Sequence, residues 1–449
     1  MNDIKHDIKK RHKNLTEFRY IAVGFFLTIL SGAIMLSLPF SSRDGQWTNF
    51  LDSLFTATSA TCVTGLVVFD TFRHWSIIGQ LVILVLIQIG GMGFISIGVA
   101  FSMLLHKKIG LRQRDLMQES VNALEIGGIV RLFSMIIRGT FLIEGIGAVL
   151  LAIRFIPDFG ILRGIYFSVF HSISAFCNAG FDLFGIKEPF SSLTFYHSNI
   201  YLNIIIMLLI ITGGIGFLVW GDIGTHKHRI RRFSLQSKVV LMTSAVLIVL
   251  PALYFFFFEY DHGTIHDRTI HSLFQSVTTR TAGFNTTDLA AMDESGTAIM
   301  VILMLIGGSP GSTAGGMKTT TFAVLLLSAI TVFSRRNDVQ CFKRRISDET
   351  VRSAGAVLFM YLVLFFTSGV IISRVENLPL LTCLFETSSA IGTVGLSLGI
   401  TSGLSAISRV ILMILMFFGR VGGLTLIYAA LPSADSQNSR LPLEKISVG

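Results

Sequence analysis

Four short segments of the sequence end in the same way, and their residue types are suited to binding a cation stripped of water. Each ends in two residues followed by a glycine. The four triplets are Val63-Thr64-Gly65, Asn178-Ala179-Gly180, Thr281-Ala282-Gly283 and Thr393-Val394-Gly395. Rings of backbone carbonyls replace the hydration shell of potassium in ion filters, and glycine adopts the backbone angles that such a ring needs. The triplets therefore predict one filter of backbone carbonyls, with potassium as its ion.

The triplets belong to a longer pattern that occurs four times. A phenylalanine stands ten residues before the glycine at Phe55, Phe170 and Phe385, and nine residues before it at Phe274. A second glycine signature follows each copy. The signatures are Gly90-Gly91-Met92-Gly93-Phe94, Gly213-Gly214-Ile215-Gly216-Phe217, Gly307-Gly308 and Gly419-Arg420-Val421-Gly422-Gly423. Four copies in register predict an internal repeat. The alternative, that the glycines are only helix-packing contacts, does not explain why the segments before them are too short to span a membrane.

The third copy of the second signature extends into a glycine-rich stretch, residues 307–321. It interrupts a long apolar run, and irregular backbone at membrane depth must lie inside protein or beside water. Met317 separates Gly316 from Lys318 and an apolar helix precedes, which argues against a phosphate-binding loop, so we expect no nucleotide on this chain. We predict a gate just below the filter; the alternative is a passive kink. The expected gate residues are Gly307, Gly308, Gly311, Gly315, Gly316, Lys318 and Arg420.

Three charged residues fall within apolar or pore-forming segments. Arg420 lies in an apolar run at the level of the gate, and a charge inside a membrane is a functional candidate. A positive charge below a cation filter would raise the barrier to free flow; the alternative is a cap on helix carbonyls or a salt bridge. Arg280 and Glu386 lie in the third and fourth segments, and we interpret them as a paired structural brace rather than an ion site.

The composition places these segments in a lipid bilayer. Of 449 residues, 51% are hydrophobic and 14% are charged, against about 25% charged residues in soluble domains. A membrane span needs roughly 20 mostly apolar residues. Eight spans are expected, at 20–40, 76–105, 131–156, 199–220, 238–258, 297–330, 354–373 and 405–431. The segments 50–66, 165–181, 270–284 and 380–396 are too short to span and read as re-entrant pore loops.

Basic residues fix the expected orientation. Lys and Arg outnumber Asp and Glu by 36 to 27, but they lie in short stretches between apolar runs, which favours a topogenic role over nucleic-acid binding. The clusters are at 5–13, 106–114, 226–232 and 335–345. All four stand at the starts of repeats, so the positive-inside rule places them, and both termini, in the cytoplasm. The N-terminus lacks the pattern of a signal peptide. The four cysteines form no CxxC and are expected to be reduced apolar fillers.

The expected fold is an all-α membrane protein with four tandem span–loop–span repeats around a central pore. Successive repeats share one orientation, so their axis lies along the membrane normal, which disfavours a transporter with inverted repeats. The expected parts are an N-terminal tail at 1–19 and repeats at 20–115, 116–225, 226–345 and 346–449, the last including a cytoplasmic tail. The spans carry no paired carboxylates or nucleophile motif, which argues against an enzyme.

The four triplets, the glycine-rich insertion and Arg420 resemble the Ktr/Trk/HKT superfamily of potassium transporters, in particular the membrane subunit of bacterial Ktr-type uptake systems. The resemblance covers essentially the whole chain. It implies a symporter-like potassium transporter of the bacterial cell membrane that forms a homodimer with one pore in each protomer. It also implies a cytoplasmic ring of nucleotide-binding regulatory subunits and stimulation by sodium. The four loops differ from one another, so an asymmetric filter is expected. A sodium-permeable or sodium-coupled member of the superfamily is the alternative.

Overall fold

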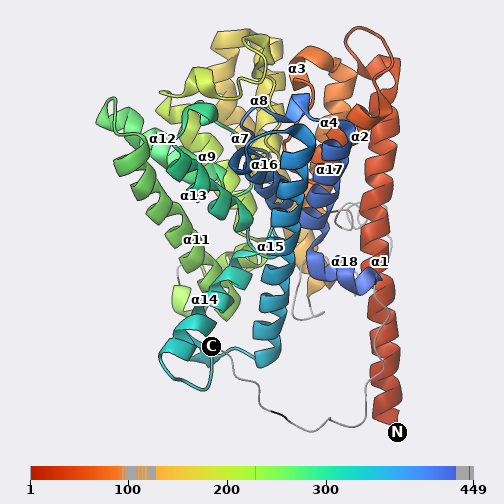
Figure 1. Ribbon diagram of the computed structural model, residues 1–449, viewed down its shortest axis with the longest axis vertical. Coiled ribbons are helices and arrows are strands. Elements are labelled where there is room, and N and C mark those ends of the chain that lie inside the picture. Colours follow the sequence, from red (N-terminus) through yellow and green to blue (C-terminus); the bar gives the residue numbers. More distant parts are fainter. Residues whose placement is uncertain are drawn as a thin grey trace.

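The computed structural model describes residues 2–93, 128–227 and 229–430, together with residues 96, 110, 114, 117, 118 and 444; the side chains of residues 2–17 and 428–430 are not described. Among these residues the chain is mostly helical (Figure 1). The helices are α1 (Asn2–Ser37), α2 (Phe50–Thr61), α3 (Thr71–His74), α4 (Ile77–Met92), α7 (Ile129–Phe159), α8 (Ile161–Phe176), α9 (Ile200–Gly214), α10 (Phe217–His226), α11 (Leu235–Tyr254), α12 (Ile265–Thr278), α13 (Glu294–Leu305), α14 (Thr319–Phe333), α15 (Asp348–Glu376), α16 (Leu380–Gly392), α17 (Ala406–Val421) and α18 (Gly423–Ala430). A π-helical turn, Phe255–Glu259, continues α11, and the two-residue strands β1 (Gln340–Cys341) and β2 (Arg344–Arg345) form a small hairpin.

Many of these helices begin at a residue whose side chain accepts a hydrogen bond from the first turn. Asn49, Ser76, Asn199, Ser234, Thr264 and Ser347 do so for α2, α4, α9, α11, α12 and α15. Such caps satisfy backbone donors that have no partner within the helix. Side-chain caps therefore mark the starts of two of the long first helices, α11 and α15, and of two of the pore helices, α2 and α12.

The first helix of each repeat is long enough to cross a membrane. Four described helical stretches qualify by length and composition. They are Phe18–Ser37, Ile129–Phe159, Leu235–Glu259 and Asp348–Glu376. Each packs against the short pore helix that follows it: α1 on α2, α7 on α8, α11 on α12 and α15 on α16. The predicted alternation of a span and a shorter segment is thus present in all four repeats.

The second helix is broken in the second, third and fourth repeats, and here the sequence-based expectation is partly wrong. We expected continuous spans over 199–220 and 405–431, but α9 and α10 form a pair bent by 93°, and α17 ends where Gly422 separates it from α18. Helix α4 likewise ends before Gly93, and the rest of the span predicted at 76–105 lies largely outside the described residues. Glycines at positive φ allow each break: +82° at Gly93, +99° at Gly216 and +94° at Gly422. The expected interruption of 297–330 is confirmed, between α13 and α14.

The repeats form a closed ring. The pore helix of each repeat packs against the second helix of the preceding repeat: α8 on α4, α12 on α9, α16 on α13 and α2 on α17. The last of these pairs joins the fourth repeat to the first, where Arg409 of α17 forms an ion pair with Asp52 in the first turn of α2. The phenylalanines of the repeat pattern, Phe55, Phe170, Phe274 and Phe385, are completely buried in the core of this ring.

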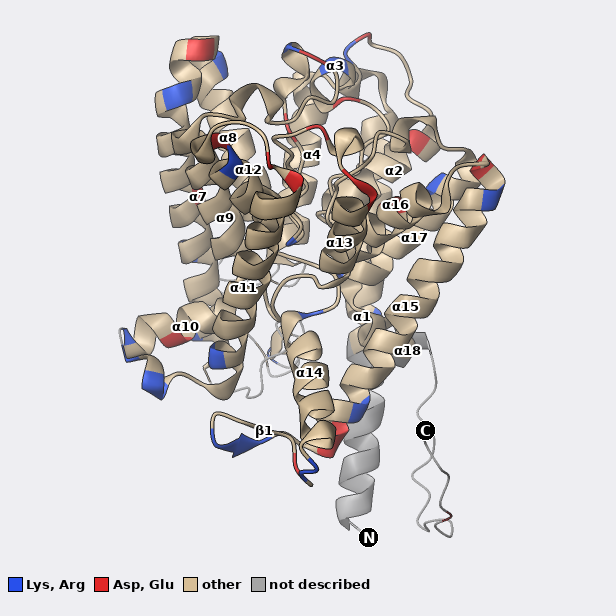
Figure 2. Cartoon of the chain, turned by 60° about the vertical axis from the view of Figure 1, so that its left-hand side comes forward, with Lys and Arg blue, Asp and Glu red and all other residues tan. Residues whose placement is uncertain are grey.

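Two of the predicted basic clusters lie at the same end of the molecule. Figure 2 shows Lys and Arg residues near α10 and around β1, at the end away from α3, and further Lys and Arg residues at the opposite end, near α3 and α8. The described parts of the predicted basic clusters, residues 229–232 and 335–345, belong to the end away from α3. Most of the cluster at 106–114 lies outside the described residues. Of the four free cysteines, Cys62, Cys177 and Cys383 are buried as expected, while Cys341 on β1 is half-buried.

Candidate ion pathway

Each pore helix ends in the same turn just before its triplet. In three repeats the N–H of the residue before the glycine donates to the carbonyl five residues earlier. These bonds are Thr64 to Ser59, Ala179 to Ser174 and Val394 to Ser389, all at 2.8 Å. In the third repeat Ala282 donates to Thr278, four residues earlier, at 3.0 Å. The predicted one-residue shortening of the third loop is therefore confirmed. The four triplets are called the filter loops below.

The backbone of the filter loops has an unusual and repeated conformation. The filter glycines, Gly65, Gly180, Gly283 and Gly395, have φ values of +95°, +68°, +79° and +94°. The first residues of the triplets also have positive φ: Val63 at +50°, Asn178 at +57°, Thr281 at +66° and Thr393 at +51°. Because left-handed residues alternate with an ordinary residue, successive carbonyls turn to one side instead of alternating as in a strand. Three of the non-glycine residues are β-branched, for which this conformation is a strained outlier typical of functional sites.

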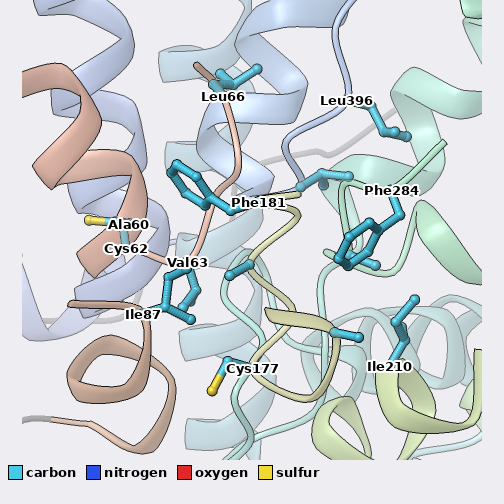
Figure 3. Close-up of a cluster of buried hydrophobic side chains, with 14 of the residues drawn as sticks. Ala60, Cys62, Val63, Leu66, Ile87, Cys177, Phe181, Ile210, Phe284 and Leu396 are labelled. Carbon is cyan, nitrogen blue, oxygen red and sulfur yellow. The ribbon is translucent and has the colours of Figure 1, made fainter. Parts of the chain in front are cut away.

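The four filter loops meet one another in cyclic order. Each filter glycine faces the carbonyl oxygen that precedes the glycine of the next repeat. The facing pairs are Gly65 with Ala179, Gly180 with Ala282, Gly283 with Val394 and Gly395 with Thr64. A Cβ at any of these glycines would lie 2.9 Å or less from that oxygen. Glycine is thus required both by its φ and by the close approach of the neighbouring loop. Figure 3 shows the residues that follow the glycines, Leu66, Phe181, Phe284 and Leu396, arriving from four different segments.

Hydroxyl groups at the ends of the pore helices hold the filter loops. Ser59 and Ser389 accept hydrogen bonds from the N–H groups of Gly65 and Gly395, both at 3.0 Å. In the other two repeats, Ser174 donates to the carbonyl of Phe181 at 2.7 Å, and Thr278 donates to that of Phe284. The sequence showed that the pore helices are rich in Ser and Thr but did not assign this role to individual residues. The available signal was a Ser or Thr six residues before the glycine, or five residues before it in the shorter third loop.

An acidic cavity of about 180 Å³ lies directly outside the filter. All four filter glycines line it, and among its described lining residues the charged ones are Asp70 and Asp182. Asp70 accepts hydrogen bonds from three backbone N–H groups, and Asp182 accepts one from Phe184 at 2.9 Å. Burial, together with the nearby Asp70, raises the pKa of Asp182 to about 7. The sequence analysis did not single out either residue.

The glycine-rich stretch 307–321, called the gate loop below, lies against the inner ends of two filter loops. Gly315 packs against the side chain of Thr393, and Gly316 has room only for hydrogen against the carbonyl of Gly392. On the second filter loop, Thr313 donates a hydrogen bond to the carbonyl of Phe176 at 3.0 Å. The second and fourth filter loops are on opposite sides of the ring. A segment that contacts both crosses the axis of the ring directly below the filter.

Arg420 ties the gate loop to its surroundings. Its guanidinium donates to the carbonyls of Thr313 and Gly90, and to that of Gly91 at 3.0 Å. The last two carbonyls belong to the C-terminal end of α4, where the helix dipole favours a positive charge. The sequence analysis left open whether Arg420 is a barrier or a helix cap; the contacts are those of a cap that also holds the gate loop.

Lys318 places a second positive charge on the inner side. Its ammonium group donates to the carbonyl of Ala314 at 2.8 Å. Lys318 and Arg420 both line an inner cavity of about 220 Å³, together with Gly311, Ser312 and Gly316. Among the described lining residues of this cavity there is no Asp or Glu. The cavity outside the filter is therefore acidic, and the cavity beside the gate loop is basic.

The expected pairing of Arg280 with Glu386 is wrong. Glu386 accepts hydrogen bonds from the hydroxyls of Ser397 and Thr401, the latter at 2.9 Å. Arg280 is 3.5 Å from the hydroxyl of Ser244, and among the described residues it forms no ion pair. Both residues are buried behind their filter loops. Glu386 is satisfied by hydroxyls of its own repeat, whereas Nε and Nη1 of Arg280 have no hydrogen-bond partner among the described residues. Because the hydroxyls of Ser397 and Thr401 already donate to the carboxylate of Glu386, this carboxylate does not require an ion pair with Arg280.

The ring of repeats, the filter and the gate loop define a membrane protein that transports cations. Comparison with known proteins agrees. The family of cation transport proteins named TrkH matches residues 7–439 of this chain. The chain belongs to this family.

Individual relatives cover almost all of the chain. The potassium/sodium uptake protein NtpJ of Enterococcus hirae is 40% identical over 98% of this chain and 99% of its own length. The Ktr system potassium uptake protein B of Bacillus subtilis is 40% identical over 96% of both chains. The crystal structure of the potassium transporter TrkH from Vibrio parahaemolyticus matches the fold with a TM-score of 0.72, at 18% identity, over 92% of this chain and 84% of that one.

Proposed function

We propose that this chain takes up potassium across a bacterial cell membrane through the filter. The observation that carries the proposal is the cyclic ring in which each filter glycine faces a carbonyl oxygen of the next repeat. A ring of oxygens from uncharged groups suits a large monovalent cation. The names of the two relatives at 40% identity both include potassium uptake. Twelve residues form this filter: the three of each filter loop.

The gate loop closes the inner end of the pathway. It crosses the axis of the ring, and Arg420 and Lys318 add positive charge where a cation would leave the filter. Two carboxylates stand at the outer cavity, so the electrostatic potential favours entry from outside and opposes leakage from inside. We infer that opening requires Arg420 to release the carbonyl of Thr313.

The proposed assembly has both termini in the cytoplasm and eight spans, four of them broken second helices. The repeat bounds are those given by the sequence, 20–115, 116–225, 226–345 and 346–449. The protein acts as a homodimer, and a cytoplasmic ring of nucleotide-binding subunits moves the gate loop. No nucleotide binds to this chain itself. Sodium is a second candidate ion, because one relative is named for both potassium and sodium.

The test of the filter is the Gly65→Ser variant. The left-handed conformation alone costs a side chain on the order of 1 kcal/mol, and about 1.4 kcal/mol is a factor of ten. The added Cβ also meets the carbonyl of Ala179. We expect weaker potassium uptake and a several-fold rise in the relative uptake of sodium. The measurement is uptake of potassium, rubidium and sodium into proteoliposomes, normalised to reconstituted protein.

Gly45→Ser is the matched control, because Gly45 also has positive φ, +70°, but has no other group within 4 Å of its Cβ position. This variant should keep the ion preference of the parent. The same comparison applies to Gly180, Gly283 and Gly395. Unchanged affinity and preference in all four filter variants would mean that the ions pass elsewhere.

A further inference from the structure

One hydroxyl group of the gate loop bonds at the start of the second filter loop. Thr313 is completely buried, and its hydroxyl donates to the carbonyl of Phe176 at 3.0 Å. The same oxygen lies 3.4 Å from Oδ1 of Asn178. Phe176 and Asn178 stand four and two residues before Gly180, at the inner end of the second filter loop. The hydroxyl proton goes to the carbonyl of Phe176, at the end of α8 just before the second filter loop, and the side chain of Asn178 in that loop lies beside the same oxygen.

Asn178 extends the contact to the third filter loop. Its side-chain amide donates to the carbonyl of Arg280 at 3.2 Å and lies 3.2 Å from the hydroxyl of Thr281. Both Asn178 and Thr281 are first residues of their triplets and have positive φ. The amide thus joins the two left-handed positions of neighbouring filter loops. A change in the position of Asn178 would therefore move both the second and the third filter loop.

The remaining polar groups of Thr313 bind other parts of the gate. Its N–H donates to the carbonyl of Gly213 at 3.2 Å, and its carbonyl accepts from Arg420. Gly213 has no space for a side chain, because the carbonyl of Phe176 and the hydroxyl of Thr313 fill it. Three groups of one residue are therefore fixed to α9, to α17 and to the filter. The gate loop cannot leave Arg420 at this point without also withdrawing the hydroxyl from the filter.

We propose that Thr313 and Asn178 make the ion preference and affinity of the filter depend on the position of the gate loop. This inference rests on the proposed filter and gate. With the gate loop in place, the second and third filter loops are held in the ring and bind potassium tightly. When the gate loop moves, the support is lost and the ion is held less tightly, which favours its release to the inside. By linkage, potassium in the filter stabilises the closed position of the gate loop.

The test compares two threonines of the gate loop. Thr313→Val removes the hydroxyl that reaches the filter, and Thr313→Ser retains it. Thr319→Val is the matched control, because the buried hydroxyl of Thr319 bonds only within the gate loop, to Ser309 at 3.3 Å. The full-length protein is reconstituted in proteoliposomes, and rubidium and sodium uptake are measured. Thr313→Val should lower the rubidium-to-sodium ratio several-fold and raise total uptake, while Thr313→Ser and Thr319→Val keep the parent ratio.

The outcomes separate this inference from the proposed function. If Thr313→Val raises total uptake but keeps the rubidium-to-sodium ratio of the parent, the result supports the gate assignment and shows that the proposed coupling to the filter is wrong. If Gly65→Ser and its three counterparts also keep the parent ratio, the filter assignment itself has failed. The two results cannot be confused, because the glycine variants do not alter the gate loop.

A second measurement keeps Thr313 unchanged and so does not depend on the folding of its variants. Ser312 lines the inner cavity, and Ser312→Cys in a Cys341→Ser background offers one accessible thiol among otherwise buried cysteines. Modification by a water-soluble thiol reagent from the inner side is timed in potassium and in sodium. Potassium should slow the modification several-fold. Equal rates in the two ions would overturn the coupling.

Discussion

At the scale of single residues, the chemistry of this protein depends on backbone geometry more than on side chains. The filter glycines were predicted because their spacing recurs four times, and each has both the positive φ and the close carbonyl that exclude other residues. Contacts such as that of Thr313 with Asn178 join positions 135 residues apart. No local pattern signals such a contact, because a buried threonine in a gate loop has no distinctive spacing.

Asp182 gives a prediction for pH dependence. Its pKa is raised to about 7 by burial and the neighbouring Asp70, so it is charged above pH 7 and neutral below. As the external pH falls from 8 to 6, the outer cavity loses one of its two negative charges. Uptake at limiting potassium should therefore fall over this range, and Asp182→Asn should remove that part of the pH dependence. Rubidium uptake at fixed internal pH measures the effect.

Asp288→Asn provides the control for Asp182. Asp288 accepts a backbone hydrogen bond two residues ahead, from Ala290 at 3.0 Å, as Asp182 does from Phe184 at 2.9 Å. Unlike Asp182, it does not line the outer cavity. Asp288→Asn should keep the pH profile of the parent. An unchanged profile in Asp182→Asn would remove Asp182 from the entry pathway.

At the scale of elements, the long first helices were predictable and the broken second helices were not. Length and apolar composition identify a span, but they do not distinguish a straight helix from one that turns by 93° at Ile215 and Gly216. The second glycine signature marks the breaks in the part of the chain that the structure describes, but its glycines also serve packing. Gly90, Gly213 and Gly419 each sit against a carbonyl of a pore helix, with no room for a side chain. The same signature thus allows both close packing and a break.

The gate loop gives the prediction at this scale. Shortening 309–320, or Arg420→Ala, should raise cation flux at least several-fold and reduce its dependence on a regulatory partner. Hydrogen bonds to a charged group contribute about 1.5–3 kcal/mol each, and Arg420 makes three to carbonyls of the gate loop and α4. Arg420→Lys keeps the positive charge but replaces the several N–H donors of the guanidinium by one ammonium group. Its flux should lie between those of the parent and of Arg420→Ala.

Flux is measured in proteoliposomes with equal amounts of reconstituted protein, with and without the partner. Lys238→Ala is a suitable control, since its ammonium bonds an exposed carbonyl at Arg231, away from the inner cavity. The gate assignment is wrong if both gate variants reach the membrane and transport at or below the parent rate.

At the scale of the whole molecule, the parallel arrangement of the repeats predicts the topology. By the positive-inside rule, the basic clusters at the starts of the repeats predict that residues 114, 232 and 345 lie in the cytoplasm. Reporter domains that are active only in the cytoplasm should therefore be active when they are fused after Arg114, Arg232 or Arg345. A reporter inserted after Gly45, in the loop before α2, should give the opposite signal. An external signal after any of the three arginines would contradict the parallel repeats.

The order of the ring has a consequence for biosynthesis. Thr64 of the first repeat and Gly395 of the last complete the ring, and Arg409 binds Asp52 across the same boundary. A chain still being made has three filter loops at most, and the side that the fourth would fill is open. Four oxygens cannot surround an ion until the last pore helix has entered the membrane. An unfinished or truncated chain therefore lacks the complete ring, and under the proposed function it has no selective filter until the fourth repeat is in place.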